Sequence, residues 1–268
     1  MKPATPAALV LCLLIAGRPA AGAEESPPRA PFRDSVRTFL DDGRYLLTFP
    51  KRAEPKGIWL TAGVLAGTLL LVGRDDEIRR EVQESDRRGP GRVATKLEPL
   101  GRSPVAAAAL GVTYLAGRAA GNRRVASTAA TSFEAFLWTF VATSAAKGIF
   151  GRQRPADGVD AHDFFAGDTI FPSGHTSRSF AIAAVVADRH GRKGAAIAYP
   201  VAALIGLATV QQDTHWASDI LAGAGLGLAI GKGIAGRHPW RDGELRAAAG
   251  TTWHVMLRRG GLVLALTY

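Results

Sequence analysis

The sequence predicts an all-α domain built as a bundle of six helices. Six apolar segments lie between residues 58 and 234, and each is too long for an ordinary β-strand. The segments are rich in Ala and Leu and contain few β-branched residues, which favours helix over strand. Gly and charged residues gather between them, as expected of the turns that join successive helices.

The six predicted helices follow one another from the N-terminal to the C-terminal end of the domain. Their approximate ranges are 58–72, 104–116, 125–146, 173–187, 195–210 and 218–234. The predicted turns are the clusters at 73–101, 117–124, 147–172, 188–194 and 211–217. Residues 24–57 are polar and punctuated by prolines, so they predict a surface arm with an amphipathic piece at about 34–47.

The tail, residues 239–268, has a different character from the helical domain at 58–238. Thr251–Leu257 and Leu262–Tyr268 flank a basic, Gly-containing turn, a pattern typical of a β-hairpin. One hairpin cannot close a barrel. We therefore expect it to pack on the helical domain.

Residues 1–23 have the pattern of a secretory signal peptide. Lys2 gives a positive start, Ala7–Ala16 an apolar run, and Ala21–Ala23 a small-residue cleavage site. The pattern predicts an exported protein of the cell envelope. The single cysteine, Cys12, lies inside this leader, so neither disulfides nor thiolate chemistry is expected in the mature chain.

Composition and charge restrict the partners of the protein. The chain is 47% apolar and 21% charged, which is rich for a soluble protein and lean for one made wholly of membrane spans. Its net charge of +10 suits anionic partners such as lipid phosphates. The basic residues lie scattered between apolar stretches and form no stripe with interleaved aromatics, so no nucleic-acid partner is predicted.

Two signals about membrane placement conflict. Most of the helices are shorter than the ~20 residues of a span, so an integral bundle and a globular periplasmic one both stay open. With a cleaved leader, three crossings before Lys147 would place this residue inside. The basic turns at 117–124 and 188–193, at the opposite helix ends, would then lie outside, against the positive-inside rule. Either the leader is not cleaved, or one helix does not cross, or the bundle is globular.

Three polar clusters stand at helix ends and carry the residues suited to chemistry. Lys147–Pro155 follows the third predicted helix, Pro172–His175 opens the fourth, and His215–Asp219 opens the sixth. Counting the helix directions puts all three clusters at the same end of the bundle. We therefore expect one site there.

The order and spacing of the three clusters, KGIFGRQRP, PSGH and HWASD, resemble the motifs of the type 2 phosphatidic acid phosphatase (PAP2) family. Its superfamily includes bacterial class A acid phosphatases and vanadium haloperoxidases, and the resemblance covers roughly residues 58–235. It implies that Lys147 and Arg154 bind phosphate and that His175 protonates the leaving group. It also implies that His215 is the nucleophile and that Asp219 orients it.

The chemistry of the residues agrees with these roles. An Arg fork and a Lys point charge can neutralise a phosphoryl group. Ser173 suits a helix N-cap, and Gly174 allows backbone amides to approach an anion closely. His215 and Asp219 are four residues apart, so on a helix the carboxylate can hold the proton of one ring nitrogen and leave the other free to attack phosphorus.

Plainer interpretations exist for each cluster taken alone. The basic residues could be helix-end or snorkelling cations, PSGH an ordinary capped helix, and the His/Asp pair a solvated surface pair. A metal site is not predicted, because no third His or acidic ligand with suitable spacing stands in these clusters. No cofactor is expected either.

One departure from the family pattern bears on the phosphate site. The family usually has a Ser-Arg pair six to seven residues before the nucleophilic His, where this chain has Ala208 and Thr209. The missing Arg would contact phosphate. Arg178, on the predicted helix of His175, and Arg152, within the first cluster, are candidates to replace it; the alternative is that both are surface or membrane-border arginines.

The sequence thus predicts a phosphatase that hydrolyses a phosphomonoester or diphosphate, expected to be lipid-linked, through a phosphohistidine. The protein is expected to be membrane-associated, with the active site facing the periplasm or exterior. Two alternatives stay open. One is a non-catalytic envelope protein that binds phosphate lipids, suggested by Thr209, and the other is a vanadate-dependent haloperoxidase, for which the chain is short.

Overall fold

The computed structural model describes residues 32–52, 54–84, 90–167, 169–239, 252–258 and 261–267, so the predicted leader at 1–23 lies outside the described residues. The helices are α2 (Phe32–Leu47), α3 (Phe49–Arg52), α4 (Pro55–Val72), α5 (Asp75–Glu84), α6 (Pro90–Leu97), α7 (Ser103–Ala119), α8 (Arg123–Phe150), α9 (Gly174–Gln211) and α10 (Ala217–Arg237). Two 3₁₀ segments, η1 (Glu98–Gly101) and η2 (Pro155–Asp157), and two strands, β1 (Thr252–Arg258) and β2 (Gly261–Thr267), complete the description.

The all-α fold class is confirmed, and each of the six predicted helices is present. They are α4, α7, α8, the two halves of α9, and α10. The halves of α9 are separate helices that meet at Gly191, where the backbone leaves the helical region (φ 59°, ψ −148°) and the chain turns back. The return brings Gly206 next to Thr176, so both ends of α9 lie at the same end of the bundle.

The region 73–101, predicted as a turn, instead holds α5, α6 and η1. The sequence of α5, DDEIRREVQE, is mostly charged and has only two apolar residues, Ile78 and Val82, although these stand four apart on one helix face. Its three acidic residues in the first turn favour a helix start there. The prediction of a simple turn was wrong because short charged helices carry little apolar signal.

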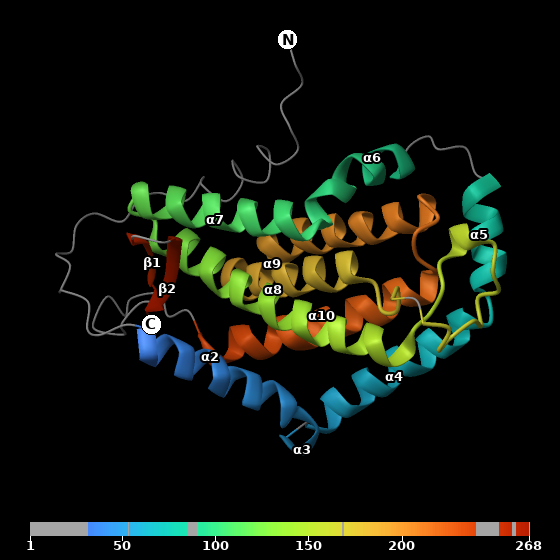
Figure 1. Cartoon of the computed structure of the whole chain (residues 1–268), viewed down its shortest axis with the longest axis horizontal. Coiled ribbons are helices and arrows are strands. Elements are labelled where there is room, and N and C mark those ends of the chain that lie inside the picture. Colours follow the sequence, from blue (N-terminus) through green and yellow to red (C-terminus); the bar gives the residue numbers. More distant parts are fainter. Residues whose placement is uncertain are drawn as a thin grey trace, which may run out of the picture.

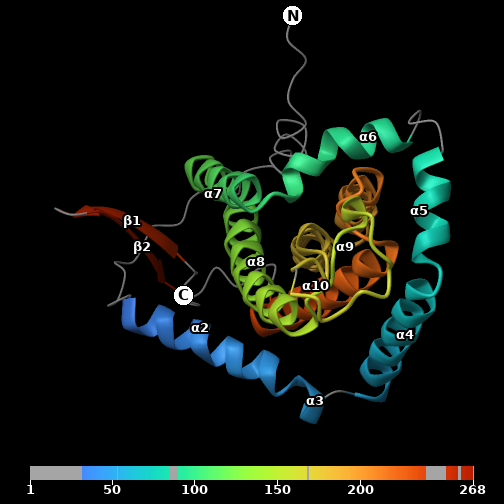
Figure 2. The ribbon, with the colours of Figure 1, turned by 45° about the vertical axis from the view of Figure 1, so that its right-hand side comes forward.

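The centre of the bundle is α9, against which α8 and α10 pack (Figures 1 and 2). Small residues allow the close approach of α10 to the first half of α9. A Cβ added at Gly227 would lie 2.1 Å from the carbonyl oxygen of Ser177, and one at Gly231 would lie 2.4 Å from that of Ala181. This contact sets the start of α10, and with it His215 and Asp219, beside the start of α9.

Three helices, α4, α9 and α10, are long and apolar enough to cross a membrane. The surface of α4 shows this character most plainly, because Trp59, Leu65, Leu69 and Leu70 are all exposed. Exposed large side chains along a whole helix are typical of a surface that faces lipid rather than water. The fold is therefore that of a membrane-associated protein.

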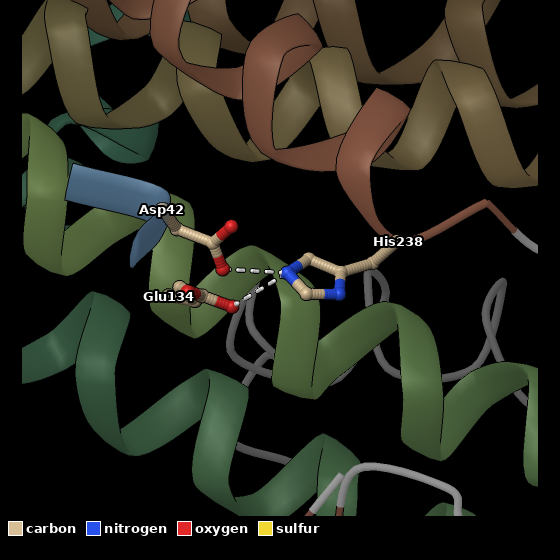
Figure 3. A group of neighbouring side chains, drawn as sticks. All are labelled: Asp42, Glu134 and His238. Atoms are coloured by element: carbon tan, nitrogen blue, oxygen red, sulfur yellow. Dashed lines mark hydrogen bonds and ion pairs between the residues drawn. The ribbon is translucent and has the colours of Figure 1, made fainter. Parts of the chain in front are cut away.

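The amphipathic piece predicted near 34–47 is α2, and it is fastened to the far end of the bundle. Asp42 is fully buried, and its Oδ2 lies 2.8 Å from His238 Nε2, which lies 3.6 Å from Glu134 Oε2 (Figure 3). The Arg237 guanidinium also donates to Asp42. These contacts tie α2 to α8 and to the residue after α10.

The predicted C-terminal hairpin is confirmed. Strands β1 and β2 pair antiparallel, from Thr252 opposite Thr267 to Arg258 opposite Gly261. Strand β2 contacts α2, so the hairpin lies at the same end as the Asp42 cluster. The opposite end of the bundle is left for the three sequence clusters.

Candidate active site

The three sequence clusters come together around one pocket of about 330 Å³ at the end of the bundle where α8 ends and α9 and α10 begin. The residues that line it are Glu98, Arg102, Lys147, Arg154, Ile170, Gly174, His175, Arg178, Gln212, Thr214 and His215. The prediction of a shared end is confirmed. The pocket is strongly cationic, which suits an anionic ligand.

His215 lies just before α10, and Asp219 lies in the first turn of that helix. The Nδ1 atom of His215 is 3.2 Å from Oδ2 of Asp219, which also accepts a hydrogen bond from the Trp216 backbone at 3.0 Å. The pair therefore has the i, i+4 contact expected from the sequence. The ring is held through Nδ1, and Nε2 is the nitrogen left for chemistry in the pocket.

Burial lowers the pKa of His215 below its ordinary value, because the charged imidazolium loses hydration. The hydrogen bond and negative charge of Asp219 act in the opposite direction, while Lys147 and Arg154 add to the lowering. The neutral ring is therefore the dominant form at neutral pH. A neutral imidazole with a fixed Nδ1 is the nucleophilic form.

Lys147 and Arg154 both line the pocket, as predicted for phosphate ligands. Lys147 is in the last turn of α8, and its Nζ donates to the Thr169 carbonyl at 2.6 Å. Gly151 ends the helix in the left-handed conformation (φ 50°), so the chain turns sharply before Arg154. The two cations thus reach the pocket from a helix end and from the loop that follows it.

The Ser173–His175 segment forms the predicted helix entry. The Ser173 hydroxyl accepts hydrogen bonds from the Thr176 backbone (3.4 Å) and hydroxyl (3.0 Å), which makes it the N-cap of α9. Gly174 and His175 line the pocket, whereas Ser173 is fully buried and is not among the described lining residues. Its place is that of a cap rather than a direct phosphate contact.

His175 has a carboxylate neighbour that the sequence did not predict. Its Nε2 lies 3.3 Å from Oε1 of Glu98, without hydrogen-bond geometry. Glu98 is 5% exposed and accepts two hydrogen bonds from Arg102, at 3.2 and 3.0 Å. It belongs to η1, far from the three motifs in the sequence, and no local pattern marks it.

The two arginines considered as replacements for the missing family Arg lie in different places. Arg178 lines the pocket and is 8% exposed, with its guanidinium 5.9 Å from the ring centres of Phe136 and Phe140. Arg152 is fully buried, and its guanidinium donates to Asp75, Asp219, Ser218 and the Ala161 carbonyl.

Arg152 is therefore neither a ligand in the pocket nor a surface arginine, so both interpretations offered for it from the sequence are wrong. Its side chain is turned into the protein behind Asp219, because buried carboxylates offer a guanidinium stronger partners than the pocket does. Thr209, at the family Arg position, is buried with its hydroxyl donating to the Gly206 carbonyl, and it lies outside the described pocket lining. Arg178 remains the candidate.

An apolar rim adjoins the pocket where α8 ends. Phe171 contacts both Phe150 and Phe164 edge to face, with ring centres 5.2 and 5.5 Å apart. Phe165 is 74% exposed, and Ile149 is 65% exposed. Exposed aromatic and aliphatic side chains beside a cationic pocket suit a ligand with an anionic head and an apolar tail.

Comparison with known proteins gives three findings. Residues 127–242 match the model of the PAP2 superfamily. A lipid A 1-phosphatase of Porphyromonas gingivalis is 36% identical over 92 residues, which is 33% of this chain and 19% of that protein. The crystal structure of a transmembrane PAP2-type phosphatidylglycerolphosphate phosphatase from Bacillus subtilis covers 66% of this chain and 94% of its own, with 19% identity and a TM-score of 0.49.

Proposed function

We propose that this chain, which belongs to the PAP2 superfamily, is a phosphatase that releases inorganic phosphate from a phosphorylated lipid through a phosphohistidine on His215. The observation that carries the proposal is the buried His215–Asp219 pair facing a pocket where Lys147, Arg154 and Arg178 converge. A neutral nucleophile beside three cations is suited to attack on a phosphoryl group.

In the proposed reaction, Nε2 of His215 attacks phosphorus as the bond between phosphorus and the leaving oxygen breaks. His175 donates a proton to that oxygen, so the leaving group departs as an alcohol or a lower phosphate. Lys147 and Arg154 neutralise the phosphoryl oxygens. Water then attacks phosphorus with His175 as the base, the bond to Nε2 breaks, and inorganic phosphate is released.

The apolar rim and the membrane helices support a lipid as the substrate. Phe165 and Ile149 would lie at the level where acyl or isoprenyl chains enter, while the cationic pocket holds the head phosphate. The similarity to a lipid A 1-phosphatase agrees with this class. The proposal covers phosphomonoesters and diphosphates, because the pocket holds cations enough for either.

The test is phosphate release from a panel of substrates by the purified full chain in detergent micelles, with His215→Ala as the blank. The panel contains phosphatidate, an isoprenyl diphosphate, lipid A and a soluble phenyl phosphate. We expect release from at least one lipid above the blank. Binding without release from any substrate would contradict the proposal and favour a phosphate-lipid-binding protein. Oxidation of bromide or chloride by the purified protein without added vanadate would favour a haloperoxidase.

Arg178 is expected to supply part of the phosphate binding that the family Arg usually gives. Loss of one charge-assisted contact costs about 1.5–3 kcal/mol, so Arg178→Ala should lower kcat/KM by roughly 10- to 150-fold. The matched control is Arg192→Ala, an exposed residue in the turn at the far end, which should change little. Equal effects of the two changes would remove Arg178 from the phosphate site, and Arg178→Lys should keep much of the activity.

The pocket end is proposed to face the periplasm or exterior. The basic turns at 117–124 and 188–193 lie at the other end of the bundle, and the positive-inside rule keeps them in the cytoplasm. We expect an alkaline phosphatase fusion at residue 160 to be active and one at residue 121 to be inactive. The reverse pattern would contradict this orientation.

The same orientation connects the leader to α4. Helix α4 ends at the same end of the bundle as the pocket, because Asp75, which begins the next helix, accepts a hydrogen bond from the Ser218 backbone. In the proposed orientation, α4 therefore begins at the cytoplasmic end. Cleavage after Ala23, as the leader pattern proposes, would place the following residues outside, and α4 could then not cross. N-terminal sequencing of the purified protein, read together with the fusions, decides how many helices cross.

A further inference from the structure

Behind the nucleophile lies a buried chain of charges that begins outside the three sequence motifs. Asp75, the first residue of α5, is 1% exposed. Its Oδ2 accepts a hydrogen bond from Arg152 Nη2 at 2.7 Å, and its Oδ1 accepts one from the Ser218 backbone at 2.9 Å. Arg152 in turn donates through Nη1 to Oδ1 of Asp219. The chain therefore runs from Asp75 through Arg152 and Asp219 to His215.

Further contacts fix this chain in place. Arg152 Nε donates to the Ala161 carbonyl at 3.0 Å, and its guanidinium lies 4.6 Å from the Phe164 ring centre and 5.2 Å from that of Trp216. Helix α5 has a second bond to the same region, because Arg79 pairs with Asp213 at 2.6 to 2.7 Å, two residues before His215. Contacts to α5 therefore hold the chain on both sides of His215, at Asp213 before it and at Ser218 after it.

The charges along the chain have a consequence for catalysis. Attack by Nε2 leaves the His215 ring positively charged, and the carboxylate of Asp219 stabilises that charge. Because Arg152 contacts Asp219, its positive charge would by itself cancel the negative charge of that carboxylate. Asp75 offsets Arg152, so the three groups together carry one net negative charge toward His215.

Asp75 holds this charge although it is buried. Burial raises its pKa above the ordinary value, and the hydrogen bonds from Ser218 and Arg152 act against that rise. Both of its oxygens accept N–H donors, an arrangement that suits a carboxylate rather than a protonated acid.

We propose that Asp75 and Arg152 are positioning residues of the active site. Arg152 fixes the orientation of Asp219, and Asp75 balances the charge of Arg152 so that Asp219 can serve His215. This assignment rests on the proposed phosphatase function. It adds to the site a residue from α5, which precedes the segment that matches the superfamily.

The test compares Asp75→Asn with Asp76→Asn in the full-length protein, on whichever panel substrate the wild type hydrolyses. Asp76 is the next acid in the same helix turn and is partly exposed. Its replacement therefore removes an equal charge and leaves the buried contacts of Asp75 and Arg152 intact. We expect Asp75→Asn to lower kcat by roughly 10- to 150-fold. KM should change little, because the groups that bind phosphate stay in place. Asp76→Asn should stay within about twofold of wild type.

The pH profile separates a positioning role from a general loss of structure. The acidic limb of kcat follows protonation of His215, which faces Asp219 from α10, Lys147 from α8, His175 from α9 and Arg154 from the loop. Asp75→Asn removes negative charge, which lowers the pKa of His215 and moves the limb to lower pH. The double variant Asp75→Asn/Arg152→Met removes both opposite charges and should return the limb to its wild-type position, even if kcat stays low.

Each outcome decides the inference. A wild-type kcat for Asp75→Asn, or a lowered kcat with an unmoved limb, overturns it while the phosphatase function stands. If Asp75→Asn does not show a thermal transition, the double variant decides: a limb displaced from the wild-type position overturns the charge balance. Equal phosphate release by wild type and His215→Ala overturns both this inference and the proposed function.

Discussion

Replacement of His215 by alanine is expected to lower phosphate release by at least about 10⁴-fold, because the covalent route would be lost with the proposed nucleophile. The phosphoenzyme gives a second measurement. Rapid quenching with a substrate labelled in its phosphate should trap an acid-labile, base-stable adduct on the wild type and none on the variant. Its disappearance together with activity would identify His215 as the attacking residue.

The control for this change is His190→Ala. His190 also belongs to the bundle and is partly buried, but it lies at the far end near Thr128, 3.3 Å from its hydroxyl. We expect this variant to keep near-wild-type turnover and the trapped adduct. Retention of the adduct by His215→Ala would contradict the assignment and direct attention to His175 as the nucleophile.

Replacement of His175 by glutamine has the second largest expected effect, and the size should depend on the leaving group. General acid catalysis contributes roughly 10²- to 10⁴-fold when the leaving oxygen needs a proton. Hydrolysis of an alkyl lipid phosphate should therefore fall by that factor. Hydrolysis of a phenyl phosphate with strongly electron-withdrawing substituents should fall much less, because such a phenolate leaves without protonation.

The comparison of the two substrates within one variant is its own control, since a misplaced pocket would slow both equally. Equal losses in kcat/KM, which reports phosphoenzyme formation and not the later attack by water, would thus show that His175 does not protonate the leaving group. Glu98, 3.3 Å from the ring, should share the pattern in weaker form, because its carboxylate stabilises the proton-bearing ring. Glu98→Gln is expected to reduce turnover of the alkyl substrate more than that of the activated phenyl phosphate.

Much of the fold could be predicted because local sequence patterns are enough to identify its long helices. The apolar segments of α4, α7, α8, α9 and α10 are long and uninterrupted, and Gly191 divides α9 where the sequence has its basic turn. The missed helices, α5 and α6, are short and contain few apolar residues, so they lack the long apolar run on which the helix predictions rested. Local composition thus identified the helices that bury or expose much apolar surface and missed the short ones between them.

The site was predictable to the extent that its residues lie at helix ends in a fixed order. The direction of successive helices was enough to bring Lys147, His175 and His215 to one pocket. The sequence could not predict, however, which way a side chain points where the chain turns after a helix. Arg152 and Arg154 are two residues apart in one cluster, yet Arg152 is fully buried behind Asp219 and Arg154 lines the pocket.

The sequence by itself determined the class of the fold, the shared end of the three motifs and the His215–Asp219 pair, because each depends on spacing along one or two helices. The tertiary structure alone decided the partners of those residues. Asp75 bonds Arg152 across 77 positions and Ser218 across 143, and Glu98 reaches His175 from a segment without a motif. Such contacts depend on how helices pack, since buried charges take the partners that packing brings within a few ångströms.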